Sequence, residues 1–521
     1  MDQNNEHIPG GSAAGSNDGL GGGKGTRAGR NWLWRHVADA RLQNCKLVFP
    51  LRIALEAPSL QQWEAKNLLR TTQHALDDIN EFSNHHLRLQ LRNVTADTNE
   101  ATTPVDGSAK DTEEETALVV KLVPAAGGSP PRAELQPYDP ILEIHYAPNH
   151  IPSSSSSSSL LATFIARELQ KIYAEEQASL ADILSSPNSG QQPPRKSTPS
   201  DLATIIAGRR TRTFRYAPTY HLTFSLFTPT SSPSAWDIES VITSHLNPLL
   251  DSLSGITNFT VDTQVQLYGT FSPTFQPSFD EASQVWNMRK DELGGFINAA
   301  DWPLSPSHGE GPTINFLLYV PSPSQSPLTI AETKGHSWLI PQWGGIYILN
   351  GFNSSNSHEL SAKVLEEPMS RFSHQLLSLL GLPATPQSLP LRISSLTRFH
   401  TASLILSSSS TLGALARLTK SLPTIAIPES VATSVTSTID HLHQACAELR
   451  EGRFAKALDE AREADGESEK AFFEKSMVGQ VYFPDEHKVA VYLPLLGPIT
   501  LPLVFAIIKD IMQYKKSLPK A

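Results

Sequence analysis

The chain has 521 residues, of which 39% are hydrophobic and 18% charged, so it can bury one large core or two. Its formal net charge at pH 7 is −10, and no long block of Lys or Arg occurs, which argues against a nucleic-acid-binding protein. Two cysteines, Cys45 and Cys446, are too few for a disulfide framework or a CxxC metal site, and they do not identify the compartment.

Residues 1–44 are rich in glycine and polar side chains, and we expect them to be a low-complexity, disordered segment. They contain no apolar stretch of about 7 to 15 residues, which a cleaved signal peptide requires. From Cys45 the hydrophobic pattern changes, and residues 45–488 are predicted to form one folded domain.

The first part of this domain is expected to mix strands with helices. Strands are predicted at KLVFPLRIAL (46–55), ALVVKLVP (117–124) and ILEIHYAP (141–148). A helix is predicted over residues 59–82, with an inward face formed by Leu60, Trp63, Leu69, Leu76 and Ile79.

A tract of seven serines (153–159) leads into a predicted helix over residues 160–184. Its inner stripe is formed by Leu161, Ile165, Leu169 and Ile172. The Ser- and Pro-rich residues 185–200 then interrupt regular structure, as a surface insertion does.

Strands and helices also alternate in the second half. YHLTFSLF (220–227) and FTVDTQVQLYG (259–269) alternate apolar and polar residues, as half-buried strands do. NFLLYVP (315–321) and GGIYIL (344–349) are continuous apolar runs, which indicate central strands. With helices expected at about 359–381 and 430–464, the predicted fold class is α/β, of the mixed α+β kind.

The C-terminal run from Val489 to Ile508 holds 20 residues and no charged side chain. As a helix it rises about 30 Å, which matches the hydrocarbon thickness of a bilayer. A cleaved GPI-attachment signal would end with its apolar stretch, whereas 13 residues follow here. The sequence therefore predicts a transmembrane helix at 489–508 and a basic tail at 509–521.

The flanks of this run predict its orientation. Four lysines and one aspartate follow it, so the positive-inside rule places the C-terminus in the cytosol and residues 45–488 in the lumen or outside the cell. Pro494, Pro498 and Pro502 fall roughly on one face, and each removes a backbone donor. They mark either a packing face for neighbouring helices or merely a kinked helix.

The sequence shows no constellation that argues for catalysis. His441, His443 and Cys446 are close in sequence, but Cys446 falls on an apolar helical stripe and is interpreted as a small buried hydrophobe. That stripe consists of Val435, Ile439, Leu442, Cys446 and Leu449. His336 has no identifiable partner in the sequence, and no metal or cofactor motif appears.

Two further short patterns carry an interpretation. PQWGG (341–345) is read as a strand-entry turn anchored by Trp343, with a ligand site as the alternative. Three N-x-S/T sequons, at Asn93, Asn258 and Asn353, are candidate glycosylation sites, although chance alone supplies about that many in a Ser/Thr-rich chain.

Several stretches occur in the order seen in the PIG-S (phosphatidylinositol glycan class S) family, which the chain resembles over about residues 45–515. They are TFSLFTP (223–229), WDIE (236–239), NFTVDTQV (258–265), NFLLYVP with SPLTI (326–330), PQWGG, and YFPDEHKVAVYLPLLGPITLPLV (482–504). The resemblance implies a non-catalytic subunit of the GPI transamidase in the endoplasmic-reticulum membrane. It also implies a catalytic cysteine on another subunit, no cofactor, and as partners the other subunits and the bilayer.

One departure from the family concerns the N-terminus. The family has a membrane span near each end, and no such apolar segment precedes Cys45, so we expect the sequence to be incomplete or alternative there. The alternative interpretation is a tail-anchored protein whose scaffold domain lies in the cytosol.

Overall fold

The computed structural model describes residues 47–92, 115–125, 130–151, 159–185, 200–269, 277–296, 311–352, 358–422, 425, 427–477 and 485–517. The chain divides into two compact units. The large unit comprises residues 46–406 and 444–462, and the described part of the small unit lies within residues 407–443 and 463–517. The predicted N-terminal segment 1–44, Asn93 and Asn353 lie outside the described residues.

The first sheet of the large unit has five strands in the order β2-β1-β3-β5-β4. Neighbouring strands are parallel except for β4, which pairs antiparallel with β5. The strands are β1 (Phe49–Glu56), β2 (His85–Leu91), β3 (Thr116–Pro124), β4 (Arg132–Leu135) and β5 (Ile141–Tyr146). The three strands predicted in this region are therefore confirmed.

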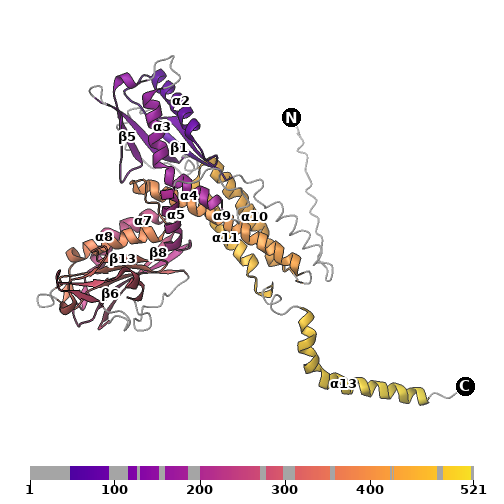
Figure 1. Cartoon of the computed structure of the whole chain (residues 1–521). Coiled ribbons are helices and arrows are strands. Elements are labelled where there is room, and N and C mark those ends of the chain that lie inside the picture. The colour runs from indigo at the N-terminus through magenta and orange to yellow at the C-terminus, as the bar shows by residue number, and fades with distance from the viewer. Residues whose placement is uncertain are drawn as a thin grey trace, which may run out of the picture. The chain divides into compact units, whose positions relative to one another are not determined.

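Two helices, α2 (Gln62–Ile79) and α3 (Leu160–Ile172), lie side by side along this sheet (Figure 1). The predicted inward face of α2 is partly wrong, because Trp63 is 51% exposed and its Nε1 donates to Gln61 Oε1. The buried side of α2 consists instead of Ala65, Leu68, Thr71, Thr72 and Leu76. The predicted stripe of α3 is confirmed, since all four of its residues are buried.

The helix predicted over 160–184 is two helices, because the chain turns at Tyr173 and restarts as α4 (Ala174–Leu184). A further helix, α5 (Ser200–Arg212), precedes the second sheet.

The second sheet has the order β13-β14-β11-β6-β8, with β8, β6, β11 and β14 parallel and β13 antiparallel to β14. Its strands are β6 (Thr219–Thr228), β8 (Asn258–Leu267), β11 (Thr313–Tyr319), β13 (Ser337–Ile340) and β14 (Gly344–Ile348). Between β6 and β8 lie α6 (Ile238–Val241), a π-helical turn (Ile242–Leu246) and α7 (Asn247–Leu253). The central placement of β11 and β14 confirms the prediction from their continuous apolar runs.

The prediction for β6 is wrong in its burial. This strand lies between β11 and β8 and is buried on both faces, whereas β8 is at the edge of the sheet and is largely accessible.

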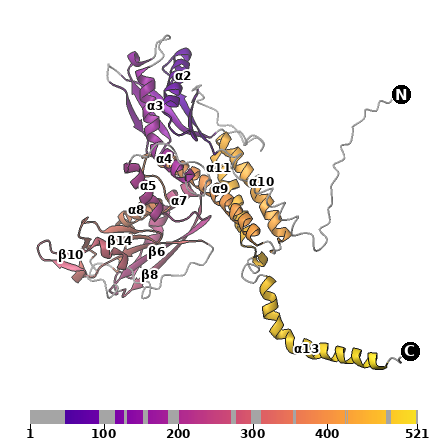
Figure 2. The ribbon, with the colours of Figure 1, turned by 45° about the vertical axis from the view of Figure 1, so that its right-hand side comes forward.

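Each face of the second sheet packs against its own cover. Helix α8 (Ala362–Leu379) packs on β14, and its Phe372 ring lies 5.2 Å from that of Phe316. On the other face, Met288, Leu328 and Ile330 join Leu317 and Ile346 in one hydrophobic cluster. They belong to the region of a small sheet, β12-β10-β9, which lies beside β14 in Figure 2. Its strands are β9 (Ser278–Asp280), β10 (Val285–Met288) and β12 (Leu328–Ile330), and a two-stranded sheet is formed by β7 (Ala235–Trp236) and β15 (Glu359–Leu360).

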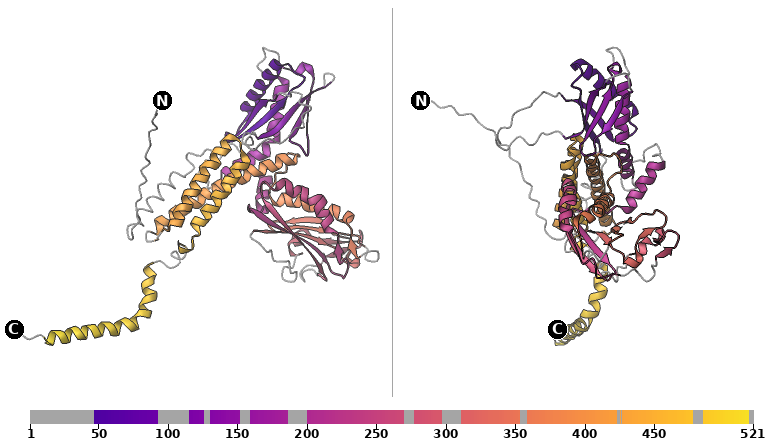
Figure 3. Two further views of the ribbon diagram at one scale, coloured as in Figure 1. Left: turned by 180° about the vertical axis from the view of Figure 1, so that it is seen from behind. Right: turned by 90° about the vertical axis from the view of Figure 1, so that its left-hand side faces the viewer.

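The described residues from Leu389 onward are mainly helical. The helix predicted over 430–464 is two helices, α10 (Glu429–Glu451) and α11 (Phe454–Phe472), and a long helix that was not predicted, α9 (Leu389–Ser421), precedes them. The last helix, α13 (Asp485–Ser517), contains all three prolines and bends part-way along its length (Figures 2 and 3).

Candidate functional site

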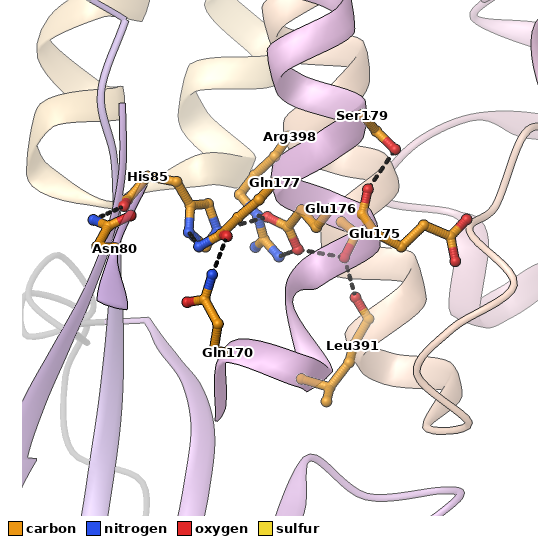
Figure 4. Close-up of polar contacts among 10 residues, drawn as sticks. Asn80, His85, Gln170, Glu175, Glu176, Gln177, Ser179, Leu391 and Arg398 are labelled. Atoms are coloured by element: carbon orange, nitrogen blue, oxygen red, sulfur yellow. Dashed lines mark hydrogen bonds and ion pairs between the residues drawn. The ribbon is translucent and has the colours of Figure 1, made fainter. Parts of the chain in front are cut away.

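Two adjacent carboxylates on α4, Glu175 and Glu176, are each only 2% exposed. They stand at the first turn of the helix, where the chain has just turned at Tyr173. Charged side chains are rarely buried unless they are paired, and Figure 4 shows His85 and Arg398 beside Glu176. We call the side chains bonded to Glu175 and Glu176 the α4 network.

Glu176 is held mainly by Arg398 of α9, which is 1% exposed. Arg398 Nε donates to Glu176 Oε1 at 2.5 Å and Nη2 donates to Oε2 at 2.8 Å, so the contact is a two-point fork. Ser395, one turn earlier on α9, donates its hydroxyl to Oε2 at 2.6 Å. The guanidinium also lies over the ring of Phe454, 5.0 Å from its centroid.

His85 of β2 brings the first sheet into the same network. Its Nε2 lies 3.3 Å from Glu176 Oε1, and its Nδ1 lies 3.2 Å from Gln177 Nε2. Gln177 Oε1 accepts from Gln170 Nε2 at 2.7 Å, which orients the amide of Gln177 so that its NH₂ faces His85. Nδ1 is therefore an acceptor, and His85 donates through Nε2 to Glu176.

Glu175 is satisfied by a different set of groups. Arg209 of α5 donates to its Oε1 at 3.0 Å, and the backbone N–H of Ala384 donates to the same oxygen at 3.1 Å. Thr385 donates to Oε2 through its N–H at 2.8 Å and its hydroxyl at 2.7 Å. This carboxylate thus ties α4 to α5 and to the segment that follows α8.

The charges of the network balance one another. Burial acts to raise the pKa of Glu176, but the charge of Arg398 and the hydrogen bonds from His85 and Arg398 outweigh it and hold that pKa well below its usual range. Burial lowers the pKa of Arg209, and Glu175 opposes that effect. Glu176 is therefore ionised, and each of the two carboxylates faces one guanidinium.

This arrangement is suited to holding helices together rather than to chemistry. Each carboxylate accepts at least four hydrogen bonds from protein groups, so none of its oxygens is free to take a proton from a substrate. One hydroxyl beside the network, that of Tyr173, is buried without a hydrogen-bond partner among the described residues. Burial raises the pKa of Tyr173 above its ordinary value, so this hydroxyl stays protonated.

Sequence reasoning missed this network, although a signal was present. The apolar stripe of α3 continues across the turn at the same spacing to Glu176 and Leu180, both buried. In α9 the buried stripe likewise contains one basic residue, and it runs through Leu391, Ser395, Arg398, Ala402 and Ile405. One acid and one base, each on an apolar helical stripe, indicate a buried ion pair.

Cys446, which lies close in sequence to His441 and His443, is not a reactive thiol. Cys446 is 4% exposed and lies on a buried stripe, as predicted, but it is disulfide-bonded. Its interpretation as a small buried residue is confirmed, whereas the disulfide was not predicted, and no thiolate is present at this position for His441 or His443 to activate. The other cysteine of the chain, Cys45, lies outside the described residues.

PQWGG forms the turn that enters β14, and Trp343 packs against the hydrophobic cluster below the second sheet. A Cβ on Gly344 would lie 1.8 Å from the carbonyl oxygen of Asn315, so this position requires glycine. The turn is thus structural, as expected.

His336 has a partner that the sequence did not reveal. Its Nε2 lies 3.1 Å from the hydroxyl of Tyr347 and 3.7 Å from Glu367 Oε1. Burial and the neighbouring Glu367 raise the pKa of Tyr347 to about 12.

The remaining candidate residues lie on β8, on α13 or outside the described ranges. Asn258 is the exposed first residue of β8, while Asn93 and Asn353 fall outside the described ranges. Pro494, Pro498 and Pro502 are exposed on α13. Within α13, the window Leu496–Gln513 has a mean hydropathy of 1.4 and is 0% buried, so the helix is long and apolar enough to cross a membrane. In the part of the chain that the structure describes, no group of three or more His, Cys, Asp or Glu side chains could hold a metal ion.

Comparison with known proteins identifies a family and several relatives that the chain resembles. A family model described as phosphatidylinositol-glycan biosynthesis class S protein matches residues 33–517. The GPI-anchor transamidase component PIGS of Bos taurus is 32% identical over 327 residues, which cover 58% of this chain and 58% of that protein. The Homo sapiens protein of the same name is 31% identical over 324 residues, 57% of this chain and 58% of the relative. The GPI transamidase component GPI17 of Saccharomyces cerevisiae is 30% identical over 311 residues, 56% of this chain and 57% of the relative. The chain thus spans somewhat more than half the length of the curated relatives that it matches.

Proposed function

The chain belongs to the PIG-S family, and from this premise we propose that it is a subunit of the GPI transamidase complex of the endoplasmic-reticulum membrane. The observation that carries the proposal is that the family match runs through both the folded units and α13. Its relatives are named as components of that complex. In this role the chain supports the attachment of GPI anchors to proteins together with other subunits.

We propose further that the subunit is non-catalytic, with the catalytic cysteine on a partner. The disulfide at Cys446 is in keeping with this division, because a disulfide sulfur cannot act as the attacking thiolate. The α4 network supports a scaffolding role, since it joins α4, α5, α9 and β2 through charges that leave no reactive group exposed.

The proposed topology places the large unit in the lumen, α13 across the membrane and the C-terminal lysines in the cytosol. Lys509, Lys515, Lys516 and Lys520 follow the apolar run, and cytosolic flanks are enriched in such residues. The disulfide at Cys446 favours the same side, because disulfides persist in the endoplasmic-reticulum lumen and are rare in the cytosol. Glycosylation at Asn93, Asn258 or Asn353 requires that side as well.

The experiment is recovery of the full, tagged chain from its own membranes in mild detergent, with its partners identified by mass. We expect subunits of the GPI transamidase in fixed proportion, and loss of anchor attachment in cells depleted of the chain. Recovery without those subunits, or normal anchor attachment after depletion, would contradict the proposal.

The same sample tests the topology. We expect an endoglycosidase to shift the mobility of the chain, and peptide mapping without reductant to show Cys446 oxidised. Bare sequons together with a reduced Cys446 would place the large unit in the cytosol and favour the tail-anchored scaffold instead.

A further inference from the structure

The prolines of α13 remove three successive backbone donors from one side of the helix. Pro494, Pro498 and Pro502 follow one another at intervals of four residues inside this helix. Proline has no N–H, so the carbonyl oxygens four residues earlier, on Ala490, Pro494 and Pro498, lack their usual intrahelical hydrogen bond. These three oxygens are called the carbonyl row below.

The carbonyl row is compact and accessible. A step of four residues advances about 6 Å along a helix and turns it by only about 40°, so the row spans about 80° of the circumference. The side chains of all three prolines are exposed, and no described residue of the window Leu496–Gln513 is buried. The row is therefore not covered by the part of the chain that the structure describes.

The side chains of the uncharged run do not supply replacement donors. Its uncharged run contains two polar side chains, Tyr492 and Thr500. Thr500 donates its hydroxyl to the carbonyl of Leu496 at 2.8 Å, and that oxygen lies on the opposite side from the row. Tyr492 is also turned about 160° away from Pro494.

Hydrocarbon cannot supply the donors either. If the apolar run begins at Val489, the carbonyls of Pro494 and Pro498 lie about 8 and 14 Å inside it. Water and lipid headgroups at the interface reach Ala490 but not that depth, and lipid tails carry no donor. Gly497, beside the row, has no atom within 4 Å of where a Cβ would lie, so another helix can approach closely there.

This inference rests on the proposed function, in which α13 crosses the membrane among other subunits. We propose that the carbonyl row is the docking surface for a transmembrane helix of a partner subunit whose side chains carry hydrogen-bond donors, such as Ser, Thr, Asn, Gln or Tyr. The acceptors come from α13 and the donors from the partner, and this complementarity fixes the rotation of α13 against its neighbour.

The test compares variants in which α13 itself provides a hydrogen-bond donor to a carbonyl oxygen of the row. Pro498→Ala restores an N–H to the carbonyl of Pro494. Leu501→Thr keeps every proline and places a hydroxyl three residues after Pro498, within reach of its free carbonyl. Leu501→Val is the matched control, because valine has nearly the shape of threonine without the hydroxyl. Each full-length chain is expressed in cells lacking the wild type, and the ratio of partner subunits recovered in mild detergent is measured by mass spectrometry.

We expect Pro498→Ala and Leu501→Thr to lower partner recovery by about fivefold, the change that corresponds to one interhelical hydrogen bond. Leu501→Val should recover partners as the wild type does. Equal recovery of partner subunits for Leu501→Thr and Leu501→Val overturns the proposal. A loss of recovery with Pro498→Ala alone also overturns it, because the prolines then act through the shape of the helix. Failure of the wild-type chain to resist alkaline extraction from membranes, or to recover any transamidase subunit, instead refutes the proposed function on which the inference rests.

Discussion

Neutralising the central carboxylate of the α4 network is expected to destabilise the large unit strongly. Glu176→Gln keeps the size of the side chain but removes the charge that is hydrogen-bonded to the guanidinium of Arg398, which is 1% exposed. Arginine cannot lose its proton to escape this penalty. Removing one partner of a buried ion pair costs about 3–5 kcal/mol, and Arg398→Met is expected to cost a similar amount because it strands Glu176.

Replacing both partners is expected to cost much less than the two single changes together. In the double variant Glu176→Met with Arg398→Met, no charge of the pair remains to be desolvated. Ser395 keeps an acceptor, because its hydroxyl also lies 2.9 Å from the carbonyl of Leu391. The Nε2 of His85 loses its acceptor, which costs about 1–3 kcal/mol. The coupling free energy between the two sites is thus at least about 3 kcal/mol.

Hydrogen exchange of the full-length chain in detergent measures this coupling locally. Peptides from α4 and the first half of α9 should exchange at least about 100-fold faster in either single variant than in the wild type, and clearly slower in the double variant than in either single one. Peptides from α13 provide the internal control, since the residues of the network lie on other elements. Additive effects of the two replacements would refute the view that Glu176 and Arg398 act as one buried unit.

Two further predictions concern pH and the β14 turn. Burial and the charge of Arg462 lower the pKa of His400 to about 4 from 6.5. Between these two pH values the unfolded chain therefore binds more protons than the folded chain. The free energy of unfolding of the large unit should fall by at most about 3 kcal/mol as the pH drops from about 6.5 to 4. Thermal unfolding across this range checks it, and His400→Leu should flatten that part of the profile, whereas an unchanged profile would contradict the assignment. Gly344→Ala should lower stability by more than about 2 kcal/mol because the new Cβ would lie 1.8 Å from the Asn315 carbonyl, whereas Gly345→Ala should cost less because it meets the movable end of Gln375. The two variants are compared by their unfolding temperatures, and equal shifts would count against the reasoning.

The hydrophobic pattern predicted the burial of β11 and β14 correctly and that of β6 wrongly. The difference lies in the polar residues of these strands. β11 and β14 are continuous apolar runs, and such runs occur where both faces are covered. β6 alternates polar and apolar residues, which is typical of a half-buried strand, yet its polar residues His221, Thr223 and Ser225 are buried. Two of them have side-chain partners on the neighbouring strand β8, since Ser225 accepts from Gln264 and His221 is hydrogen-bonded to Thr260, so the polar residues did not indicate an exposed face.

The α4 network marks a second limit of the sequence. Glu176 falls on an apolar stripe, and this fact could have predicted that it is buried. Its partner Arg398 is 222 residues away, and no local pattern connects the two. Burial of Cys446 was predicted for the same local reason, whereas its oxidation depends on a distant cysteine and on the compartment.

The contacts of the first sheet also determine when the large unit can finish folding during synthesis. β1 lies near the start of the described chain, yet Arg52 donates to the backbone of Glu451, and the N–H of Phe454 donates to Glu115. The ring of Phe454 also packs against the guanidinium of Arg398. A ribosome must therefore release almost the entire unit before its earliest strands meet their last neighbours, and contacts of such sequence separation form slowly. Newly made chains consequently expose incomplete sheet and helix surfaces for most of their translation, so chaperones are expected to bind them until residues 451–454 emerge.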